Sequence, residues 1–236
     1  MHYNICLTLS TGCIHRKYRN TNCNYKMTLK QNKCFIIDLY LQYNMARNLE
    51  FNEEEAIQKA MEVFWKKGYN GASVRNLTDA MNINSSSLYN TVGDKHQLFV
   101  KCIRNYTQGR MRDAVAHAST IKSPLKAIIN YINDAVNAIL YNNESCLAIK
   151  TTFEVAASAP DVQAVLREDN EFTYGFLLNL INKAIDAKEL DANTDAEVVT
   201  DFIIMMFTGW HESYILHKDP TKIKKMAKYL IKQLLN

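Results

Sequence analysis

The feature that most constrains this chain is a succession of amphipathic runs, several of them opened by a residue suited to cap a helix. In the first run, Asn52 and Glu55 have the spacing of a capping box, and apolar residues follow at intervals of three and four: Ile57, Ala60, Met61 and Phe64. Only seven Gly and three Pro occur in 236 residues, too few breakers for an all-β protein. The sequence therefore predicts an all-α fold.

About nine helices are expected after residue 45. Ser73 is expected to cap the second helix, Asp94 with Gln97 the fourth, and Thr194 with Glu197 the eighth. The expected helices are, in order, 53–68, 74–81, 85–90, one from 95, one from 124, 146–157, 161–188, 194–217 and 220–235. No strand pattern interrupts them.

Residues 1–44 differ from the rest of the chain. They are aperiodic and contain four of the six cysteines. Their six Lys and Arg against one Asp give them a charge of +5, whereas the whole chain carries +4. We interpret them as a non-native or disordered extension and expect the functional chain to begin at Met45. The remainder carries about −1, so net charge alone does not argue for nucleic acid.

Cys102 and Cys146 are too few for a disulfide framework or a four-ligand zinc site, and this usage favours the reducing cytoplasm. The longest apolar run near the C-terminus, 202–206, is far shorter than the roughly 20 residues that a membrane helix needs, so no membrane segment is expected.

Residues 73–90 have what a helix-turn-helix requires. An apolar seam is predicted from Leu77, Met81, Ile83 and Leu88. Asn82 stands at the turn, where a residue must tolerate positive φ. Short polar residues, Asn84 to Ser87, open the second helix at the end that would enter a major groove.

At these residues the chain resembles the DNA-binding domain of the TetR family. The resemblance covers about 55 residues and four helices, and the motifs that carry it are Gly68-Tyr69, Ala72-Ser73-Val74-Arg75-Asn76-Leu77, Met81-Asn82-Ile83, Ser87-Leu88-Tyr89-Asn90 and Gly93-Asp94-Lys95 followed by Leu98-Phe99. Four positions depart from the usual pattern: Thr78, Asn82, Ser86 and Val92. Ser86 lies in the reading helix, so it bears on sequence preference more than on fold.

The resemblance implies roles for single residues. Ser73 and Arg75 would meet phosphate or a groove edge, Tyr89 would touch the DNA backbone, and Lys95 would hold a phosphate. The residues that would face bases are Ser85, Ser86, Ser87 and Asn90. The family also implies a three-helix DNA-binding domain at 45–94 and a helical ligand-binding and dimerisation domain at 95–236.

The C-terminal part is rich in aromatic residues, which could line a ligand cavity or form plain core: Phe153, Phe172, Tyr174, Phe176, Phe207, Trp210 and Tyr214. We expect an apolar or aromatic effector, because no nearby cation falls clearly on an apolar stripe; the candidates are Arg110, Arg112, Lys150 and Arg167. The apolar helices at about 194–217 and 219–235 predict a homodimer, with an intrachain core as the alternative.

Other chemistry is weakly indicated. His211 and His217 are about 240° apart on a helix, so with Glu212 they make a poor metal site. Cys102 and Cys146 could form a redox switch or be core residues. No nucleophile with a base, glycine-rich phosphate loop or catalytic carboxylate pair is evident, and no cofactor is expected. The sequence therefore predicts a ligand-responsive DNA-binding regulator, with a helical module or enzyme that keeps the fold but reads no DNA as the alternative.

Overall fold

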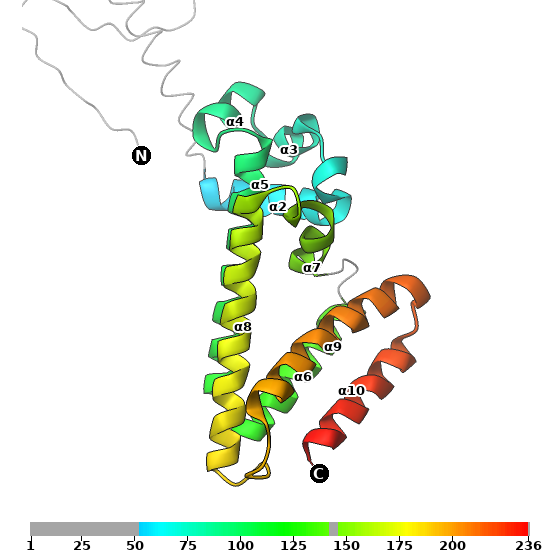
Figure 1. Ribbon diagram of the computed structural model, residues 1–236. Coiled ribbons are helices and arrows are strands. Elements are labelled where there is room, and N and C mark those ends of the chain that lie inside the picture. The colour runs from blue at the N-terminus through cyan, green and yellow to red at the C-terminus, as the bar shows by residue number, and fades with distance from the viewer. Residues whose placement is uncertain (1–51, 142–145, 236) are drawn as a thin grey trace, which may run out of the picture. The chain divides into compact units, whose positions relative to one another are not determined.

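The computed structural model describes residues 52–141 and 146–235, so the expectations for residues 1–44 and for Met45 lie outside the described residues. Within the described residues, nine α-helices and one π-helical turn form the fold, without strands (Figure 1). The elements are α2 (Glu53–Gly71), α3 (Val74–Met81), α4 (Ser85–Thr91), α5 (Lys95–Ser119), α6 (Pro124–Tyr141), α7 (Leu147–Thr151), η1 (Thr152–Ala156), α8 (Pro160–Asp186), α9 (Ala196–His217) and α10 (Pro220–Leu234). The expected all-α fold is confirmed.

Helices α2, α3 and α4 pack around the first turns of α5 (Figure 1). Their core is fully buried and consists of Phe64, Leu77, Leu88, Leu98 and Phe99. The rings of Phe64 and Phe99 meet edge to face, with 4.8 Å between centroids. We call residues 52–94 of this unit the reading head.

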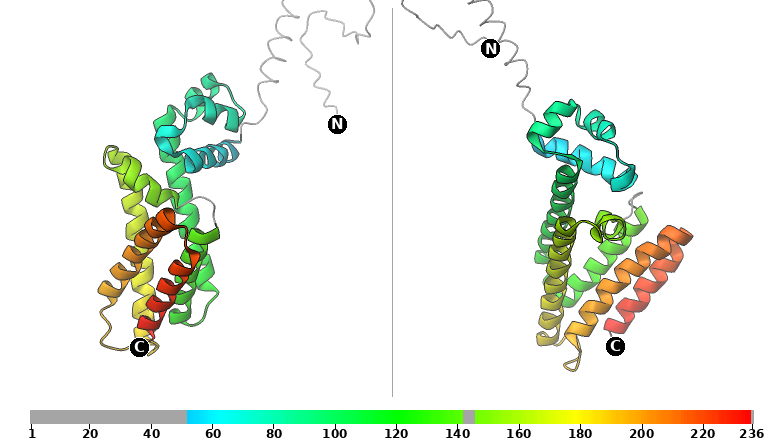
Figure 2. Two further views of the ribbon diagram at one scale, coloured as in Figure 1. Left: turned by 90° about the vertical axis from the view of Figure 1, so that its right-hand side faces the viewer. Right: turned by 45° about the horizontal axis from the view of Figure 1, so that its top comes forward.

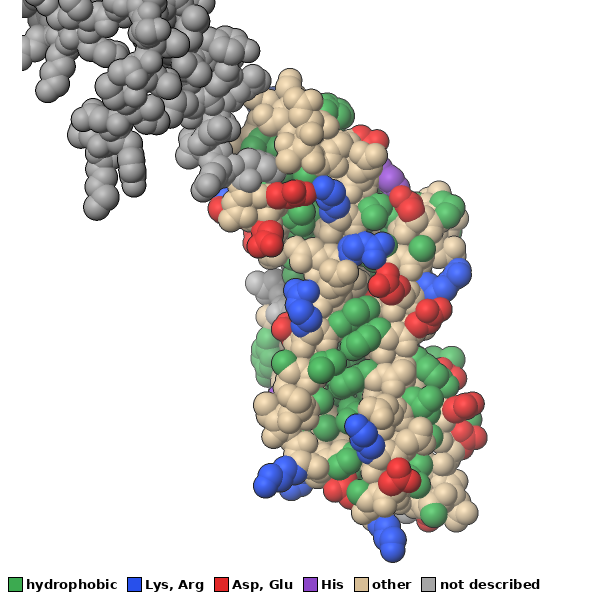
Figure 3. Space-filling model, turned by 90° about the vertical axis from the view of Figure 1, so that its left-hand side faces the viewer, with side chains coloured by type: hydrophobic (Ala, Val, Ile, Leu, Met, Phe, Trp, Pro, Cys, Tyr) green, Lys and Arg blue, Asp and Glu red, His purple; other side chains and the backbone are tan. Residues whose placement is uncertain are grey.

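The long helices α5 and α8 run side by side and connect the reading head with the rest of the chain (Figures 1 and 2). Figure 3 views their outer face, where apolar side chains gather in a streak with charged side chains scattered on both sides. A second core lies where α6, α8, α9 and α10 meet, and it includes Ile128, Ile132, Leu177, Ile181, Ile203 and Trp210. This second unit, residues 95–235, is called the sensing domain below.

Several predicted caps are confirmed. Ser73 forms a complete capping box with Asn76, and Asp94 forms one with Gln97. At α2 only half of the box exists: Asn52 accepts from the Glu55 amide at 3.2 Å, while the Glu55 carboxylate pairs with Lys59 at 2.6 Å.

One local expectation is wrong, and another is incomplete. The cap of α9 is Asp195, whose carboxylate accepts from the Val198 amide at 3.1 Å, and the Thr194 amide instead donates to the Asp191 carbonyl in the preceding turn. The helix expected at 146–157 is confirmed, but after Thr151 it changes from the α-helix α7 to the π-helical turn η1, which was not predicted.

Candidate nucleic-acid interface and internal cavity

The turn between α3 and α4 depends on one left-handed residue. Asn82 has φ 56° and ψ 43°, as the sequence predicts, and its amide donates to the Asp79 carbonyl at 3.3 Å. The next amide, of Ile83, donates to the Thr78 carbonyl at 3.1 Å, which closes the end of α3. Buried Leu77 and Leu88 then hold the two helices together.

Helix α4 presents a polar, uncharged surface. Its cap is Asn84, which accepts from the Ser87 amide at 2.8 Å. Ser85, Ser86, Tyr89 and Asn90 are exposed, and Ser87 is half-buried. Within the described part of the chain, none of the three serine hydroxyls makes a hydrogen bond, so they are available to an external partner.

The predicted phosphate-binding residues surround this helix but are partly engaged. The Ser73 hydroxyl accepts from the Asn76 amide at 3.1 Å, so it also has a structural role. Arg75 lies 3.7 Å from Asp79 in a highly exposed ion pair. The Lys95 ammonium lies 4.5 Å from the centre of the Tyr69 ring, which positions it at the start of α5.

The reading head is also held by a distant side chain. Helix α2 kinks at Gly68, which has φ 72° and ψ 173°. The amides of Tyr69 and Asn70 then donate to the Glu154 carboxylate of η1, at 3.1 and 2.9 Å. The connection between α2 and α3 is therefore fixed by a residue of the sensing domain.

A cavity of about 500 Å³ lies among α5, α6, α7, α8 and α9, and Trp65 of α2 reaches its wall. The aromatic residues that line it are Trp65, Tyr106, Tyr131, Phe176 and Phe207. Tyr131 packs against Phe176 and Phe207, with ring centroids 5.5 and 5.8 Å apart. This size and lining suit a small organic molecule.

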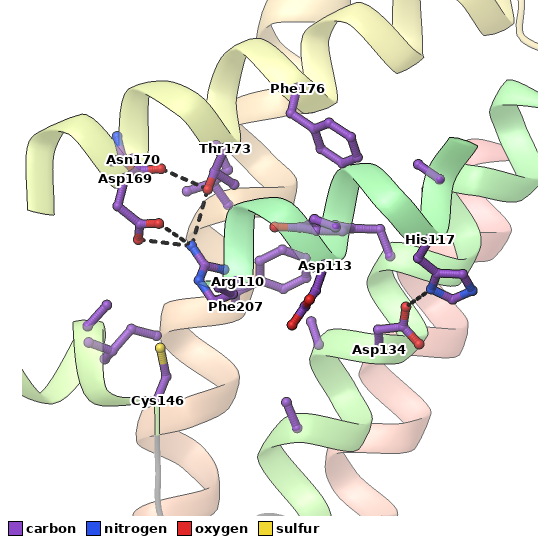
Figure 4. Close-up of a pocket in the computed structure, with 18 of the residues that line it drawn as sticks. Arg110, Asp113, His117, Asp134, Cys146, Asp169, Asn170, Thr173, Phe176 and Phe207 are labelled. Atoms are coloured by element: carbon purple, nitrogen blue, oxygen red, sulfur yellow. Dashed lines mark hydrogen bonds and ion pairs between the residues drawn. The ribbon is translucent and has the colours of Figure 1, made fainter. Parts of the chain in front are cut away.

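An ion pair lies inside the cavity (Figure 4). One terminal nitrogen of Arg110 donates to both carboxylate oxygens of Asp169, at 2.8 and 2.9 Å, and lies 3.3 Å from the Thr173 hydroxyl. Burial by itself would lower the pKa of Arg110, but Tyr131 and Asp169 raise it overall, so the guanidinium stays charged. The Nε atom of Arg110 is buried and has no hydrogen-bond partner within the described residues.

His211 of α9 faces the same group. Burial, with a smaller effect from Arg110, lowers its pKa to about 4, so its imidazole is neutral at pH 7. His217 lies exposed at the end of α9, and no metal-binding group of three His, Cys, Asp or Glu residues occurs in residues 52–141 and 146–235.

Two further carboxylates border the cavity, Asp113 on α5 and Asp134 on α6. The Asp134 carboxylate lies 2.7 Å from Nδ1 of His117, within hydrogen-bond distance, and both side chains are about half exposed. Asp113 projects between this pair and Arg110 in Figure 4. Asp113 forms no ion pair with any residue that the structure describes.

The two described cysteines differ. Cys146 lines the cavity and accepts a hydrogen bond from the Tyr106 hydroxyl at 3.5 Å. Burial, with Cys146 nearby, raises the pKa of Tyr106. Cys102 is fully buried, and burial raises the pKa of its thiol to about 12. Both are free thiols.

Sequence reasoning identified part of this cavity. Phe176 and Phe207 line it, whereas Phe153 is exposed and Trp210 is in the core. The expectation that no cation faces the apolar interior is wrong for Arg110, because Asp169, on another helix, neutralises it there. Trp65 was missed because it belongs to α2. Spacing along one helix gives no information about either contact.

Among the described residues, no helix is both long and apolar enough to cross a membrane.

Comparisons with known proteins agree with this geometry. Residues 56–102 match the family described as bacterial regulatory proteins, tetR family, and residues 122–230 match the tetracyclin repressor-like C-terminal domain. An uncharacterised HTH-type transcriptional regulator of Bacillus subtilis strain 168, YezE, is 27% identical over 163 residues, which cover 67% of this chain and 84% of YezE. The repressor ComR of Escherichia coli K12 is 21% identical over 165 residues, 67% of this chain and 77% of ComR.

Solved structures share the fold. A cysteine mutant of CifR, complexed with 26-bp double-strand operator DNA, has a TM-score of 0.69 and 22% identity, over 78% of this chain and 97% of that one. The reduced form of E. coli NemR has a TM-score of 0.71 and 11% identity, over 78% and 96%. The chain belongs to the TetR family of bacterial transcriptional regulators.

Proposed function

We propose that this regulator is a repressor that a small molecule releases from a near-palindromic operator. Two subunits would place α4 in successive major grooves about 34 Å apart. Two observations together carry the proposal. The serine hydroxyls of α4 make no hydrogen bond within residues 52–141 and 146–235, and Trp65 of the same head helps to line the cavity. An occupant of the cavity would thus touch the head directly.

The proposed contacts divide into two kinds. Ser85, Ser86, Ser87 and Asn90 read base edges, since short hydroxyl and amide groups can donate to and accept from them. Ser73, Arg75, Tyr89 and Lys95 hold phosphates and fix the register. Because α4 carries no charge, the salt dependence of binding comes from Arg75, Lys95 and the helix N-termini.

We assign DNA binding to residues 45–94 and ligand binding and dimerisation to 95–236. Two large exposed apolar groups support a homodimer. They lie on α9 (Val198, Phe202, Met205) and on α10 (Met226, Tyr229), and the two helices lie side by side in the left view of Figure 2. Stable homodimers bury such surface. Sedimentation should give a dimer at tens of micromolar; a monomer there would contradict the assignment.

The effector is proposed to be an apolar or aromatic molecule that is neutral or cationic. Phe176, Phe207 and Tyr131 offer its body a stacking surface. Arg110 is already neutralised by Asp169, and Asp113 and Asp134 add negative charge at the cavity border. An anionic effector would therefore meet more carboxylates than free cations.

The same proposal assigns the chain to the cytoplasm, where bacterial operators are bound, and gives it no catalytic step and no cofactor. The alternative, a helical module or enzyme that reads no DNA, predicts that no upstream sequence is preferred over random DNA.

Binding of the purified chain to its own upstream DNA, over a salt series, tests the proposal. Lys95→Ala should weaken binding to all sequences alike and flatten the salt slope by about one phosphate contact. Ser87→Ala or Asn90→Ala should cost about 1–3 kcal/mol on the preferred site only. Lys126→Ala, an exposed change on α6, is the matched control and should alter neither quantity. Equal affinity for upstream and random DNA would refute the repressor assignment.

A further inference from the structure

We propose that Glu154 is the positioning residue through which occupancy of the cavity reaches the reading head, with α7 and η1 as the moving segment. The inference rests on the proposed function, because it names the regulation of the same cavity. Glu154 contacts neither the cavity nor the surface proposed for DNA. It acts through the backbone that it holds.

At the head, the Glu154 carboxylate fits against the turn that follows Gly68. Both oxygens accept from successive backbone amides, those of Tyr69 and Asn70. Those amides point at η1 only because Gly68 takes positive φ and turns the chain there. A Cβ at position 68 would lie 2.7 Å from Oε2 of Glu154, so the carboxylate sits directly against the turn. Charge-assisted hydrogen bonds of this kind are short and directional.

At the other end, the same segment forms part of the cavity wall. Cys146, Ala148 and Ile149 line the cavity, five to eight residues before Glu154. Between them, the Lys150 ammonium donates to the Trp65 carbonyl of α2 at 2.6 Å. A ligand that displaces Cys146 or Ile149 therefore moves a short segment that touches the head twice.

The segment is suited to move as a unit. Helix α7 has only five residues, and η1 continues it with π-helical hydrogen bonding. This geometry is rare overall, and where it occurs it often marks a functional site. In the π turn, the exposed Glu154 side chain points to the head, while Val155 and Ala156 are buried. A shift of α7 would thus pull the carboxylate from the two amides and free the connection that leads into α3.

Other contacts between the head or α5 and the rest of the chain are less direct. His96 pairs with Asp161 at 2.8 Å and Arg104 pairs with Glu168 at 3.1 Å. Both are largely exposed side-chain pairs between α5 and α8, and neither holds head backbone. Glu168 therefore provides a matched carboxylate for control experiments.

The test fills the cavity without knowledge of the natural effector. N-benzylmaleimide is the probe: the Cys146 sulfur forms a bond to one alkene carbon, and the thiol proton is balanced by a proton added to the other. The protein is the full chain with Cys6, Cys13, Cys23 and Cys34 changed to Ser. Buried Cys102 should stay unmodified, which mass spectrometry verifies. Affinity for upstream DNA is measured before and after labelling.

Labelling should lower DNA affinity at least about tenfold in the parent and in the Glu168→Gln control. In Glu154→Ala the loss should fall below about threefold. Glu154→Gln keeps one acceptor oxygen and should lie between them. Unlabelled Glu154→Ala should already bind upstream DNA about tenfold more weakly than the unlabelled parent, because the amides of Tyr69 and Asn70 have lost their acceptor. Unlabelled Glu168→Gln should bind within about threefold of the parent, and all variants should melt at a similar temperature. A purely structural role would instead leave the two effects independent, so labelling would weaken Glu154→Ala by a further factor of about ten.

Coupling is reciprocal, so upstream DNA should slow labelling of Cys146 in the parent and less so in Glu154→Ala. Equal losses of DNA affinity in the parent and both Glu154 variants would overturn the proposal, as would labelling that leaves the DNA affinity of the parent unchanged. Failure of the proposed function has a separate signature, because the unlabelled parent would then not prefer its upstream DNA.

Discussion

The polar contacts that shape the reading-head surface are local, whereas those that shape the interior of the sensing domain join distant residues. In the head, Asn52, Ser73 and Asn84 each bond an amide three residues away, and Asn82 closes its turn with its near neighbours. In the sensing domain, Arg110 pairs with Asp169, 59 residues away, and the Glu189 carboxylate accepts from the Leu125 amide, 64 residues away. Local contacts shape a surface for an external partner, and long-range contacts shape an interior.

This difference has an energetic consequence. A cap or an exposed pair is solvated in both the folded and the unfolded chain, so losing it costs little. A charge inside the sensing domain has lost its water, so its partner determines whether the fold tolerates it. We therefore expect the largest effects of single substitutions in the sensing domain, and the predictions below test this.

The sharpest test compares two ion pairs. Asp169→Ala should lower the free energy of unfolding by about 3 kcal/mol, the low end for a broken buried pair, because Asp169 is 9% exposed and Arg110 36% exposed. Asp79→Ala, which breaks the exposed pair with Arg75, should leave stability unchanged. Denaturant unfolding of both variants gives the values. Similar losses at the two sites would remove the distinction between the regions.

Acid should destabilise the sensing domain through His211. Its folded pKa of about 4 lies below the ordinary 6.5, so the unfolded chain binds a proton first as the pH falls. Stability from this group is complete above pH 6.5 and is lost progressively toward pH 4. Between pH 7 and 5 the loss should be about 2 kcal/mol, and His211→Asn should remove that slope. His217→Asn is the exposed control and should retain it; an unchanged slope in His211→Asn would count against the assignment.

Caps should have smaller effects that the local geometry alone decides. Ser73→Ala, Asn84→Ala and Asp195→Ala should each cost about 1 kcal/mol, because each leaves a helix amide without its acceptor. Thr194→Ala should cost nothing measurable. Thermal unfolding compares the four variants, and a larger loss for Thr194 than for Asp195 would reverse the cap assignment.

The two thiols should differ in reactivity with no change in stability. Cys146 borders the cavity and should react with a thiol reagent in the native state. Cys102, with its raised pKa of about 12 and its Sγ donating to the Ile57 carbonyl, should react only on unfolding. Peptide mapping after a timed exposure distinguishes them, and equal native rates would show that the cavity wall is not open at Cys146.

The same contrast explains what the sequence could predict. The helices, the boxes at Ser73 and Asp94 and the left-handed Asn82 are encoded in a few adjacent residues, so pattern reasoning found them. It misplaced the cap of α9 by one residue, because Thr194 and Asp195 both suit that role and only the turn with Asp191 decides between them. The division of 146–157 into α7 and η1 depends on packing against α2 and α8, which no local pattern contains.

The cavity was predicted only in outline. Aromatic richness indicated it, but the lining residues Trp65, Tyr106 and Tyr131 come from three different helices, and Arg110 faces inward only because Asp169 meets it there. Such pairs become visible when the helices are placed in space. The proposed DNA contacts are a different case, since they come from family resemblance and stay predictions.

Gly68 and Glu154 limit how this chain can diverge. Any side chain at position 68 would have to adopt positive φ and would collide with the Glu154 carboxylate as it now lies. A relative that replaces Gly68 must therefore also shorten or redirect residue 154, and one that replaces Glu154 first relaxes the restriction on 68. Over evolutionary time, substitution of Glu154 should therefore precede substitution of Gly68. Grafting this head onto another sensing domain would require carrying both residues across.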